Sequence, residues 1–505
     1  MRRPKRPPPH LYSFLYKRYT NKTFHEMTRS RHLLAAVAIT MGTLGANARK
    51  AWTMVSTSDR TTSLQTTRTK LDKKAASPTL FQLNADITYQ QMDGFGAALT
   101  GSSCYNLMQM KPSKRKQFLE YTFSQKKGLG MSYVRISIGC SDFSLSEYTC
   151  CDTPGIEHFA LQTEELNYVI PILKEVLAIN PDLKILGSPW TCPKWMKVKD
   201  LHKLEPLDSW TSGQLNPKYY KDYATYFVKW IKAMAEHGIN IYGITPQNEP
   251  LNRGNSASLY MGWREEMTFL KEALGPAFKA AGLSTRIYAF DHNYNYDNIL
   301  EENDYPAHIY DNEDAAAFVT GAAYHNYGGN KKELLDIGTR YPDKELIFTE
   351  TSIGMWNDGR NLEKRLIEDM KEVALGTVNN GCKAVIVWNL MLDTDRGPNR
   401  EGGCQTCYGA VDIDRNNYSD ITYNSHYYAI GHMAYAVRPG AVRVQSTVSS
   451  PKDGILYASF LNTDGSWAFV TCNTTMQAQE ISITADGEHY INTTLPARSA
   501  ASFRW

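Results

Sequence analysis

Two glutamates stand in similar settings, each directly after a short apolar run that is typical of a buried strand. Glu249 lies in the segment ITPQNEPLN, between Asn248 and Pro250, and Glu350 lies in the segment FTETS. Because a proline disfavours the helical region for the residue before it, we expect Glu249 to be held extended at the end of its strand. Two carboxylates placed in this way could act together on one acetal carbon.

The chemistry available to such a pair is the displacement of a glycoside. One carboxylate attacks the anomeric carbon, while the other, kept protonated, gives its proton to the leaving oxygen. A retaining pair stands about 5–5.5 Å apart, and an inverting pair stands wider to admit water. We expect Glu350 to be the ionised nucleophile, held charged by Arg135 and hydrogen-bonded by Tyr327, and Glu249 to be the acid.

Further polar and aromatic side chains follow other predicted strands. The Asn248 amide could bond a sugar 2-hydroxyl, and two tryptophans could offer flat faces to a pyranose. Taken singly, a strand-end tryptophan is as often core, a histidine can be a satisfied polar core residue, and a glutamate is most often a helix cap or surface ion pair. Their convergence favours a site that contains Asp142, Trp190, His325 and Trp388.

The elements that must position these residues alternate between strands and helices. An alternation of this kind, repeated eight times across about 300 residues, is typical of a (β/α)8 barrel, whose functional groups lie at the C-terminal ends of its strands. An open doubly wound sheet is the competing arrangement, but no G-x-G-x-x-G follows the first strand. The predicted strands are 93–100, 131–139, 183–190, 242–249, 285–291, 321–327, 345–352 and 383–390.

Two other patterns complete the fold prediction. In the helix predicted over 217–238, the aromatic residues recur at helical spacing and are expected to be core. From about residue 425 the chain changes to short alternating strands with turns between them, which predicts a β-sandwich completed by strands near 51–92. We therefore expect the barrel to span 93–424 and the sandwich to combine 49–92 with 425–505.

The first 48 residues resemble a targeting segment and not part of the fold. They hold nine of the 55 Lys and Arg and one of the 52 Asp and Glu, so the remainder carries a formal charge of −5, which argues against binding to nucleic acid. Arg29 and Arg31 precede an apolar run over 33–45 and the small residues of 46–48, as in a secretory signal that starts at Met27. The run is too short to span a bilayer, and a small buried helix is the alternative.

The nine cysteines give no metal site. Cys404 and Cys407 form a lone C-x-x-C, which is weak evidence for zinc because a structural site needs four ligands. In an exported protein a local disulfide is the better interpretation. Since nine is an odd number, at least one thiol is free or pairs outside the chain, and buried inert thiols are expected at Cys104, Cys192, Cys382 and Cys472. The sequence predicts no metal and no cofactor.

Several blocks, taken in order, resemble glycoside hydrolase family 30, the family that includes glucosylceramidase. The resemblance runs from about residue 80 to the C-terminus. The blocks are MDGFGAALTGSS, VRISIGCSDFSLSEYTCCDTP, ILGSPWTCPKWMK, ITPQNEP, FTETS, VWNLMLD, GPNREGGC and YYAIGHMAYAVRPGAVRV.

This resemblance implies a barrel with a side β-sandwich, with Glu249 as the acid/base and Glu350 as the nucleophile. It also implies a sugar pocket lined by Asp142, Trp190, Asn248, Tyr327, Trp388 and Asn399. The animal glucosylceramidases carry an aromatic residue where Asn326 follows His325, whereas the block GGCQTCYGAVDID resembles the microbial branch with endo-β-1,6-glucanases.

The preferred interpretation is an exported retaining β-glycoside hydrolase that cleaves β-1,6-glucan. The alternatives are a glucosylceramidase acting on glycosphingolipid, a β-xylosidase, and an inactive exported sugar-binding protein. The sequence leaves open whether cleavage is endo or exo and which oligomeric state the protein adopts.

Overall fold

The structure is a computed structural model that describes residues 50–295 and 299–505. The expected signal segment, with its start at Met27, lies outside these residues.

The larger domain is built on a sheet of eight parallel strands in the order β4-β14-β12-β11-β10-β9-β6-β5. A bridge between Ala98 and Arg135 continues the pairing from the first strand to the second and closes the sheet. The predicted (β/α)8 barrel is confirmed, and each of the eight predicted ranges contains one of its strands or the larger part of one. The strands are β4 Gly94–Ala97, β5 Tyr133–Ser137, β6 Lys184–Ser188, β9 Gly243–Ile244, β10 Arg286–Asn293, β11 Gly321–His325, β12 Glu345–Glu350 and β14 Ala384–Val387.

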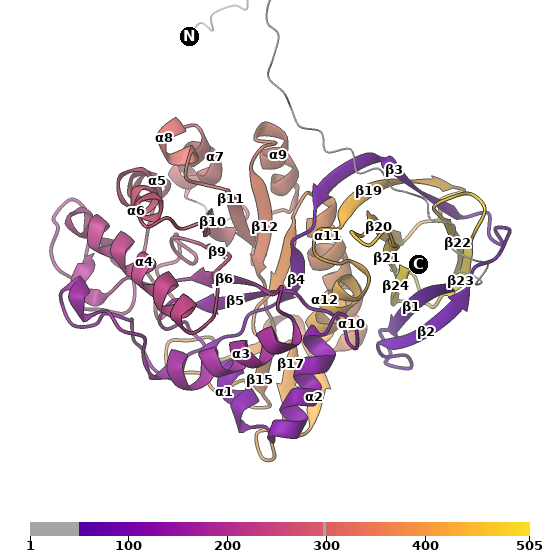
Figure 1. The fold of residues 1–505 in the computed structure, drawn as a ribbon, viewed down its shortest axis with the longest axis horizontal. Helices are drawn as coiled ribbons and strands as arrows, with labels where there is room; N and C mark the ends of the chain where they lie inside the picture. The colour runs from indigo at the N-terminus through magenta and orange to yellow at the C-terminus, as the bar shows by residue number, and fades with distance from the viewer. Residues whose placement is uncertain (1–49, 296–298) are drawn as a thin grey trace, which may run out of the picture. The chain divides into compact units, whose positions relative to one another are not determined.

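Helices surround this barrel (Figure 1). In α4, Tyr220–Glu236, the apolar side chains at helical spacing are buried against the barrel, as the sequence predicted. The other helices are α1 Gly101–Gln109, α2 Pro112–Phe123, α3 Ile170–Ile179, α5 Trp263–Phe269, α6 Gly275–Ala280, α7 Tyr305–Tyr310, α8 Glu313–Ala316, α9 Lys332–Arg340, α10 Leu362–Asp369, α11 Leu375–Asn379 and α12 Ser425–Ala436.

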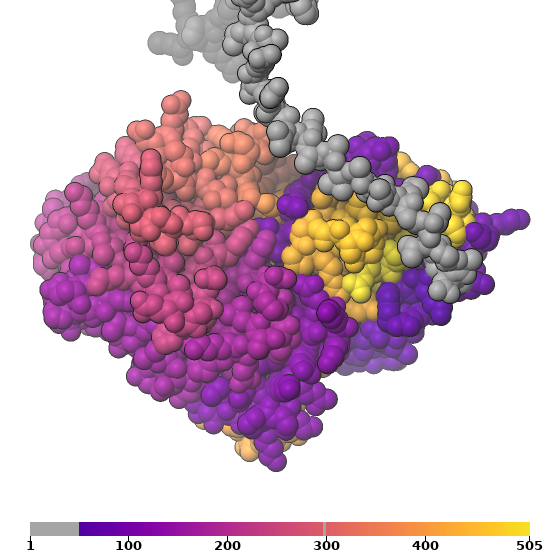
Figure 2. All heavy atoms as spheres, in the orientation of Figure 1, coloured from indigo at the N-terminus to yellow at the C-terminus, as the bar shows by residue number. Residues whose placement is uncertain are grey.

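A β-sandwich domain contains strands from both ends of the described chain. Its strand order is β2-β1-β24-β21-β20-β19-β3-β22-β23, and its buried core includes Phe81, Phe469 and Phe503. Indigo N-terminal and yellow C-terminal strands therefore lie side by side in Figures 1 and 2. The strands are β1 Lys50–Thr57, β2 Gln65–Lys70, β3 Leu80–Gln91, β19 Val442–Ser449, β20 Ile455–Leu461, β21 Trp467–Asn473, β22 Gln479–Thr484, β23 Ile491–Leu495 and β24 Ser499–Arg504.

Helix α12 joins the sandwich to the barrel, and every one of its residues is buried. It contacts α10 and β4 on one side and β24 and β21 on the other. His432 fixes this packing, because its two ring nitrogens lie 2.8 Å from Oγ of Ser502 and 2.9 Å from Oγ of Ser56. Burial lowers the pKa of His432 to about 3, so the imidazole is neutral there.

Among the helices of residues 50–295 and 299–505, none has an apolar stretch of the length needed to cross a membrane.

Candidate active site

A cavity of about 530 Å³ opens where the barrel strands end. Its walls come from the segments that follow strands β5, β9, β10, β11, β12 and β14, which is the face where functional groups are expected in this fold. Both Glu249 and Glu350 line it, together with Asp142, Tyr327 and Trp388.

The two glutamates approach each other closely. One carboxylate oxygen of Glu249, one of Glu350 and a ring nitrogen of His325 all lie within 4.8 Å of one another. A metal could in principle use such donors, but the Glu350 carboxylate already binds the Arg135 guanidinium, which would repel a cation. An approach of two carboxylate oxygens within 4.8 Å fits the spacing of a retaining pair, about 5–5.5 Å, better than the wider spacing of an inverting pair.

Glu350 is held from two sides by the residues that the sequence pattern indicated. Nη1 of Arg135 donates a hydrogen bond to Oε2 of Glu350, and the Tyr327 hydroxyl donates to Oε1 at 2.8 Å. Each carboxylate oxygen of Glu350 therefore has its own donor. The carboxylate is fixed in orientation, as a nucleophile requires.

Arg135 is itself fixed by several contacts. Its Nη2 donates to Oδ1 of Asn248 at 2.6 Å and to Oδ2 of Asp291 at 2.8 Å. Because the guanidinium occupies Oδ1 of Asn248, the Nδ2 group is the one that could donate to a sugar hydroxyl. The guanidinium also lies over the rings of Trp190 and Trp388, at 4.9 and 5.4 Å from their centroids.

His325 lies between two carboxylates. Its Nδ1 is 3.2 Å from Oε1 of Glu249, and its Nε2 is 3.0 Å from Oδ1 of Asp291. An imidazole donates from both nitrogens only when it is protonated. Burial by itself lowers the pKa of His325, but the charge of Glu350 and the contacts with Asp291 raise it to about 9.

This contact bears on the expectation that Glu249 carries the proton for the leaving oxygen. Burial alone would raise the pKa of Glu249, but the hydrogen bond with His325 and nearby positive charge lower it to about 2. Burial raises the pKa of Glu350, and the charges of His325 and Arg135 offset this only in part. The directions of these shifts favour a proton on His325 over one on Glu249, and the position of His325 beside Glu249 could not be foreseen from sequence spacing.

The backbone at Glu249 also differs from the prediction. It is left-handed, with φ 44°, instead of extended. Proline at 250 disfavours only the right-handed helical region, so the left-handed turn remains open to this residue. The amide of Glu249 donates to the carbonyl oxygen of Asp291 at 3.0 Å, and this bond holds a conformation that costs about 1–3 kcal/mol.

The other predicted residues are divided between the cavity and its surroundings. Trp388 lines the cavity, whereas Trp190 is 1% exposed, stacks on Trp388 with ring centroids 5.1 Å apart, and is not among the lining residues. Oδ1 of Asp142 is buried without a hydrogen-bond partner. Burial and the charges of Glu350 and Glu249 raise the pKa of Asp142 to about 7. An acceptor of this kind suits a sugar hydroxyl.

The structure does not bring Asn399 into the cavity. Its Nδ2 donates to the carbonyl oxygens of Arg396 and Cys404, at 2.9 and 3.5 Å, and the side chain is not among the lining residues. The local disulfide that the sequence favoured is present between Cys404 and Cys407, and both cysteines line the cavity. The other seven cysteines are free and buried.

Sequence reasoning missed Asp291. It lies in β10, whose C-terminal end was given no functional group, although the rule that identified the other strand ends applies equally to this strand. The residue is fully buried and accepts hydrogen bonds from Thr245 and Thr349 as well as from Arg135. The segment after Glu249 was missed too, where Asn252 and Asn255 donate to Oε2 of Glu249 at 2.8 and 3.3 Å.

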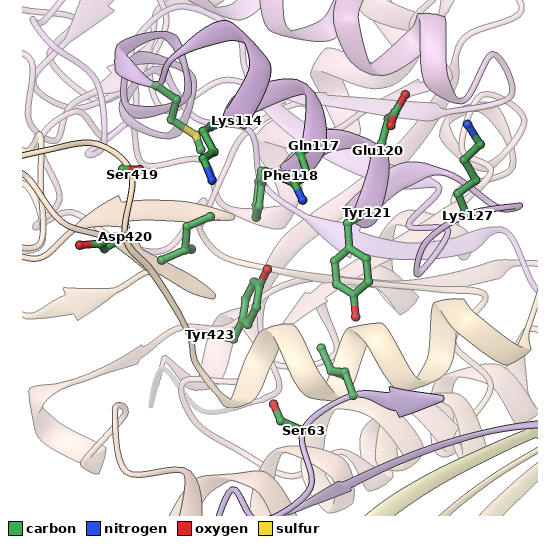
Figure 3. Close-up of a pocket in the computed structure, with 13 residues that line it drawn as sticks. Ser63, Lys114, Gln117, Phe118, Glu120, Tyr121, Lys127, Ser419, Asp420 and Tyr423 are labelled. Carbon is green, nitrogen blue, oxygen red and sulfur yellow. The ribbon is translucent and has the colours of Figure 1, made fainter. Parts of the chain in front are cut away.

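A larger cavity, of about 690 Å³, lies away from these carboxylates (Figure 3). Helix α2 provides Lys114, Gln117 and Tyr121, and the segment 419–423 provides Asp420 and Tyr423 on the facing side. It contains none of the residues described above. Size alone therefore does not identify the reactive site, and the arrangement of charged groups does.

Comparisons with known proteins agree with this geometry. Residues 92–437 match the glycosyl hydrolase family 30 TIM-barrel domain, and residues 440–503 match the beta sandwich domain of the same family. The chain is 31% identical over 426 residues to endo-1,6-beta-D-glucanase BGN16.3 of Trichoderma harzianum, which covers 79% of this chain and 81% of that protein. It is 29% identical over 407 residues to putative glucosylceramidase 2 of Caenorhabditis elegans, covering 78% and 76%. The solved structure of the endo-β1,6-glucanase BT3312 is 61% identical, with a TM-score of 0.89, and covers 90% of this chain and 99% of that one.

Proposed function

Because the chain belongs to glycosyl hydrolase family 30 and is an O-glycosyl hydrolase, we propose that it cleaves β-1,6-linked glucan by a retaining double displacement. The observation that carries the proposal is the approach of the Glu249 and Glu350 carboxylates within 4.8 Å. The glucanases among its relatives support the choice of substrate.

In the first step Glu350 attacks the anomeric carbon and forms a glycosyl ester, and the bond to the leaving oxygen breaks. The leaving oxygen takes a proton from Glu249, which receives it from His325 across the 3.2 Å contact. As the ester forms, the charge of Glu350 is lost, and that charge is a main cause of the raised pKa of His325. Loss of the nucleophile's charge thus favours release of the proton at the moment when it is needed.

In the second step a water on the side of Glu249 attacks the anomeric carbon and gives a proton to Glu249, while the ester bond breaks and Glu350 leaves as a carboxylate. Asp142, Asn248 and Trp388 hold the sugar throughout, through its hydroxyls and one ring face. Trp190 does not contact the sugar but stacks on Trp388 and so fixes the position of that ring. His325 and Arg135 are positioning residues for the two glutamates.

The test of this function is Glu350→Gln. We expect hydrolysis of an aryl β-glucoside to fall by more than about 1,000-fold, because the amide cannot form the ester. Glu345→Gln is the matched control, since Glu345 lies at the other end of the same strand and contacts Arg286 and Lys383. Unchanged turnover in Glu350→Gln would remove the assigned nucleophile.

The substrate is tested by product analysis on β-1,6-glucan, β-xylan and glucosylceramide in parallel. The second candidate, cleavage of a glucosylceramide, is favoured by the match to putative glucosylceramidases. If glucose is released from glucosylceramide faster than products are released from β-1,6-glucan, glucosylceramide becomes the preferred substrate and β-1,6-glucan the second candidate. The distribution of chain lengths also tells endo from exo cleavage.

The proposal includes export from the cytoplasm. Its support is the signal-like pattern within residues 1–48 and the Cys404–Cys407 disulfide, a bond typical of oxidising compartments. Expression from Met27 followed by N-terminal sequencing of the secreted protein tests it. A product that keeps residues 27–48 would contradict the assigned signal.

A further inference from the structure

Trp356 differs in exposure from Trp388, which also lines the catalytic cavity, and from Trp190, which stacks on Trp388. Trp190 and Trp388 are at most 2% exposed, whereas Trp356 lines the cavity with 53% of its surface exposed. It lies in the short turn Met355–Asn357, a few residues after the proposed nucleophile Glu350. An aromatic ring left half-exposed beside a reactive pair has a surface available for a ligand.

The turn that carries Trp356 is anchored rather than loose. The short strand β13, Ile353–Gly354, pairs with β16, Cys407–Tyr408, and the amide of Met355 donates to the carbonyl oxygen of Thr406 at 2.9 Å. The ring packs over Gly354, where an added methyl group would lie 2.0 Å from the indole. The position of the ring thus depends on the facing strand β16.

Strand β16 is fixed in turn by the Cys404–Cys407 disulfide, which closes the segment just before it. Cys407 pairs directly with Gly354, so the disulfide and the Trp356 turn are in register. Both cysteines line the same cavity as the indole. This wall of the cavity therefore has two parts: the segment closed by the Cys404–Cys407 disulfide, and the turn that carries Trp356, which is hydrogen-bonded to that segment.

The other wall of this part of the cavity follows Glu249. Asn252 and Asn255 donate to the Glu249 carboxylate, and Arg253 stacks on Tyr260 at 3.6 Å. Since Glu249 is the group assigned to protonate the leaving oxygen, the leaving part of the substrate lies beside this segment. Asp142 and Trp388, which the proposed function assigns to the sugar that undergoes attack, line the same cavity.

We propose that Trp356 is the stacking platform for the sugar unit on the leaving side of the cleaved bond, and that the Cys404–Cys407 disulfide positions it through the β13–β16 ladder. This inference rests on the proposed function and adds the residue that makes the enzyme select a glycan as leaving group. A pyranose presents an apolar C–H face to an indole and keeps its hydroxyls in water, which suits a half-exposed ring. Binding at this distance from the reacting atoms contributes to the rate when it orients the bond to be cleaved.

The test compares two substrates that differ only in what leaves. A β-1,6-linked gluco-oligosaccharide has a sugar to stack on Trp356, whereas β-glucosyl fluoride has a single atom. For Trp356→Ala we expect kcat/KM on the oligosaccharide to fall about 10- to 100-fold and kcat/KM on the fluoride to stay within about twofold. Trp356→Phe should restore most of the loss, because a phenyl ring keeps a stacking face.

Trp52→Ala is the matched control, since Trp52 is 38% exposed on strand β1 of the sandwich. This substitution should leave kcat/KM unchanged on both substrates. Equal losses on both substrates for Trp356→Ala would show that the ring supports the glutamates instead, and no loss on either would show that it binds no sugar. A wild-type protein that cleaves the fluoride but no β-1,6-linked oligosaccharide would instead reject the substrate assignment, and this inference with it.

The disulfide is tested separately with the double variant Cys404→Ser/Cys407→Ser. We expect it to lose oligosaccharide cleavage several-fold while keeping cleavage of the fluoride. Treatment with dithiothreitol should bring the wild-type protein to the level of the double variant and leave the double variant unchanged. Full oligosaccharide activity in the double variant would overturn the positioning role of the disulfide.

Discussion

Glu249 and Asp291 are joined at two points. The amide of Glu249 donates to the carbonyl oxygen of Asp291 at 3.0 Å, and His325 bridges the two carboxylates with contacts of 3.2 and 3.0 Å. Both backbones are left-handed, with φ 44° and 60°. Asp291 also binds Arg135, which holds Glu350. One buried carboxylate therefore connects the two proposed catalytic glutamates.

The substitution Asp291→Asn tests this connection. It removes a buried negative charge that faces both Arg135 and His325, and leaving buried charges without a partner costs about 3–5 kcal/mol of unfolding free energy. The pKa of His325, which contacts with Asp291 help to raise, should fall, and the basic limb of the pH–rate profile should move to lower pH. Urea unfolding and kcat/KM against pH measure the two effects.

Thr349→Val is the control for Asp291→Asn. It removes one neutral donor, 2.6 Å from Oδ1 of Asp291, and keeps the charge. We expect a loss of about 1.5–3 kcal/mol, the usual value for a hydrogen bond to a charged acceptor, and an unshifted pH profile. If both variants lose the same stability and keep the same profile, charge is not what Asp291 contributes.

The stability of the protein should fall on the basic side because of His325. Its pKa is raised in the folded state to about 9 from an ordinary 6.5, so its contribution is fully present below pH 6.5 and is lost as the pH rises through 9. The full loss amounts to about 3 kcal/mol. Between pH 6 and 10 the wild-type protein should lose that much more unfolding free energy than His325→Gln. Parallel curves for the two proteins would show that His325 is neutral in the fold.

Seven of the nine thiols should resist modification in the native protein. The free cysteines are all buried, and burial raises the pKa of Cys140 and Cys192 to about 12, so little thiolate forms at neutral pH. Alkylation of the native protein should label none of the seven, and alkylation after unfolding without reductant should label all of them. Labelling of nine thiols after unfolding would show that Cys404 and Cys407 are reduced.

Much of the fold could be predicted because its signals are local. Each barrel strand is a short apolar run bounded by turns, and eight such runs separated by helical patterns admit few arrangements. The rule that groups lie at the C-terminal ends of strands then brought together Arg135, Glu249, His325 and Glu350, which are in contact in the structure.

The remaining details depend on tertiary contacts that spacing does not encode. The pKa of Glu249 is lowered because His325 lies against it, and Trp190 is covered because Trp388 stacks on it. Asn399 lies in a segment where its amide bonds to nearby carbonyls and turns away from the cavity. Asp291 could be recognised in the sequence as a carboxylate near the end of a strand. Its role in holding Arg135 and His325 follows only from the five side chains that donate hydrogen bonds to it in the structure.

The stereochemistry of a rescued variant gives the sharpest test of the pair. In Glu249→Ala the proton donor is missing, so glycosides with poor leaving groups should react slowly while those with good leaving groups still form the ester with Glu350. Azide, an anion, can then enter the space that the Glu249 carboxylate has vacated and attack the ester from that side. Two inversions give the β-azide, which NMR distinguishes from the α-azide. An α-azide would mean a single inversion, and it would contradict the retaining pair inferred from carboxylates within 4.8 Å of each other.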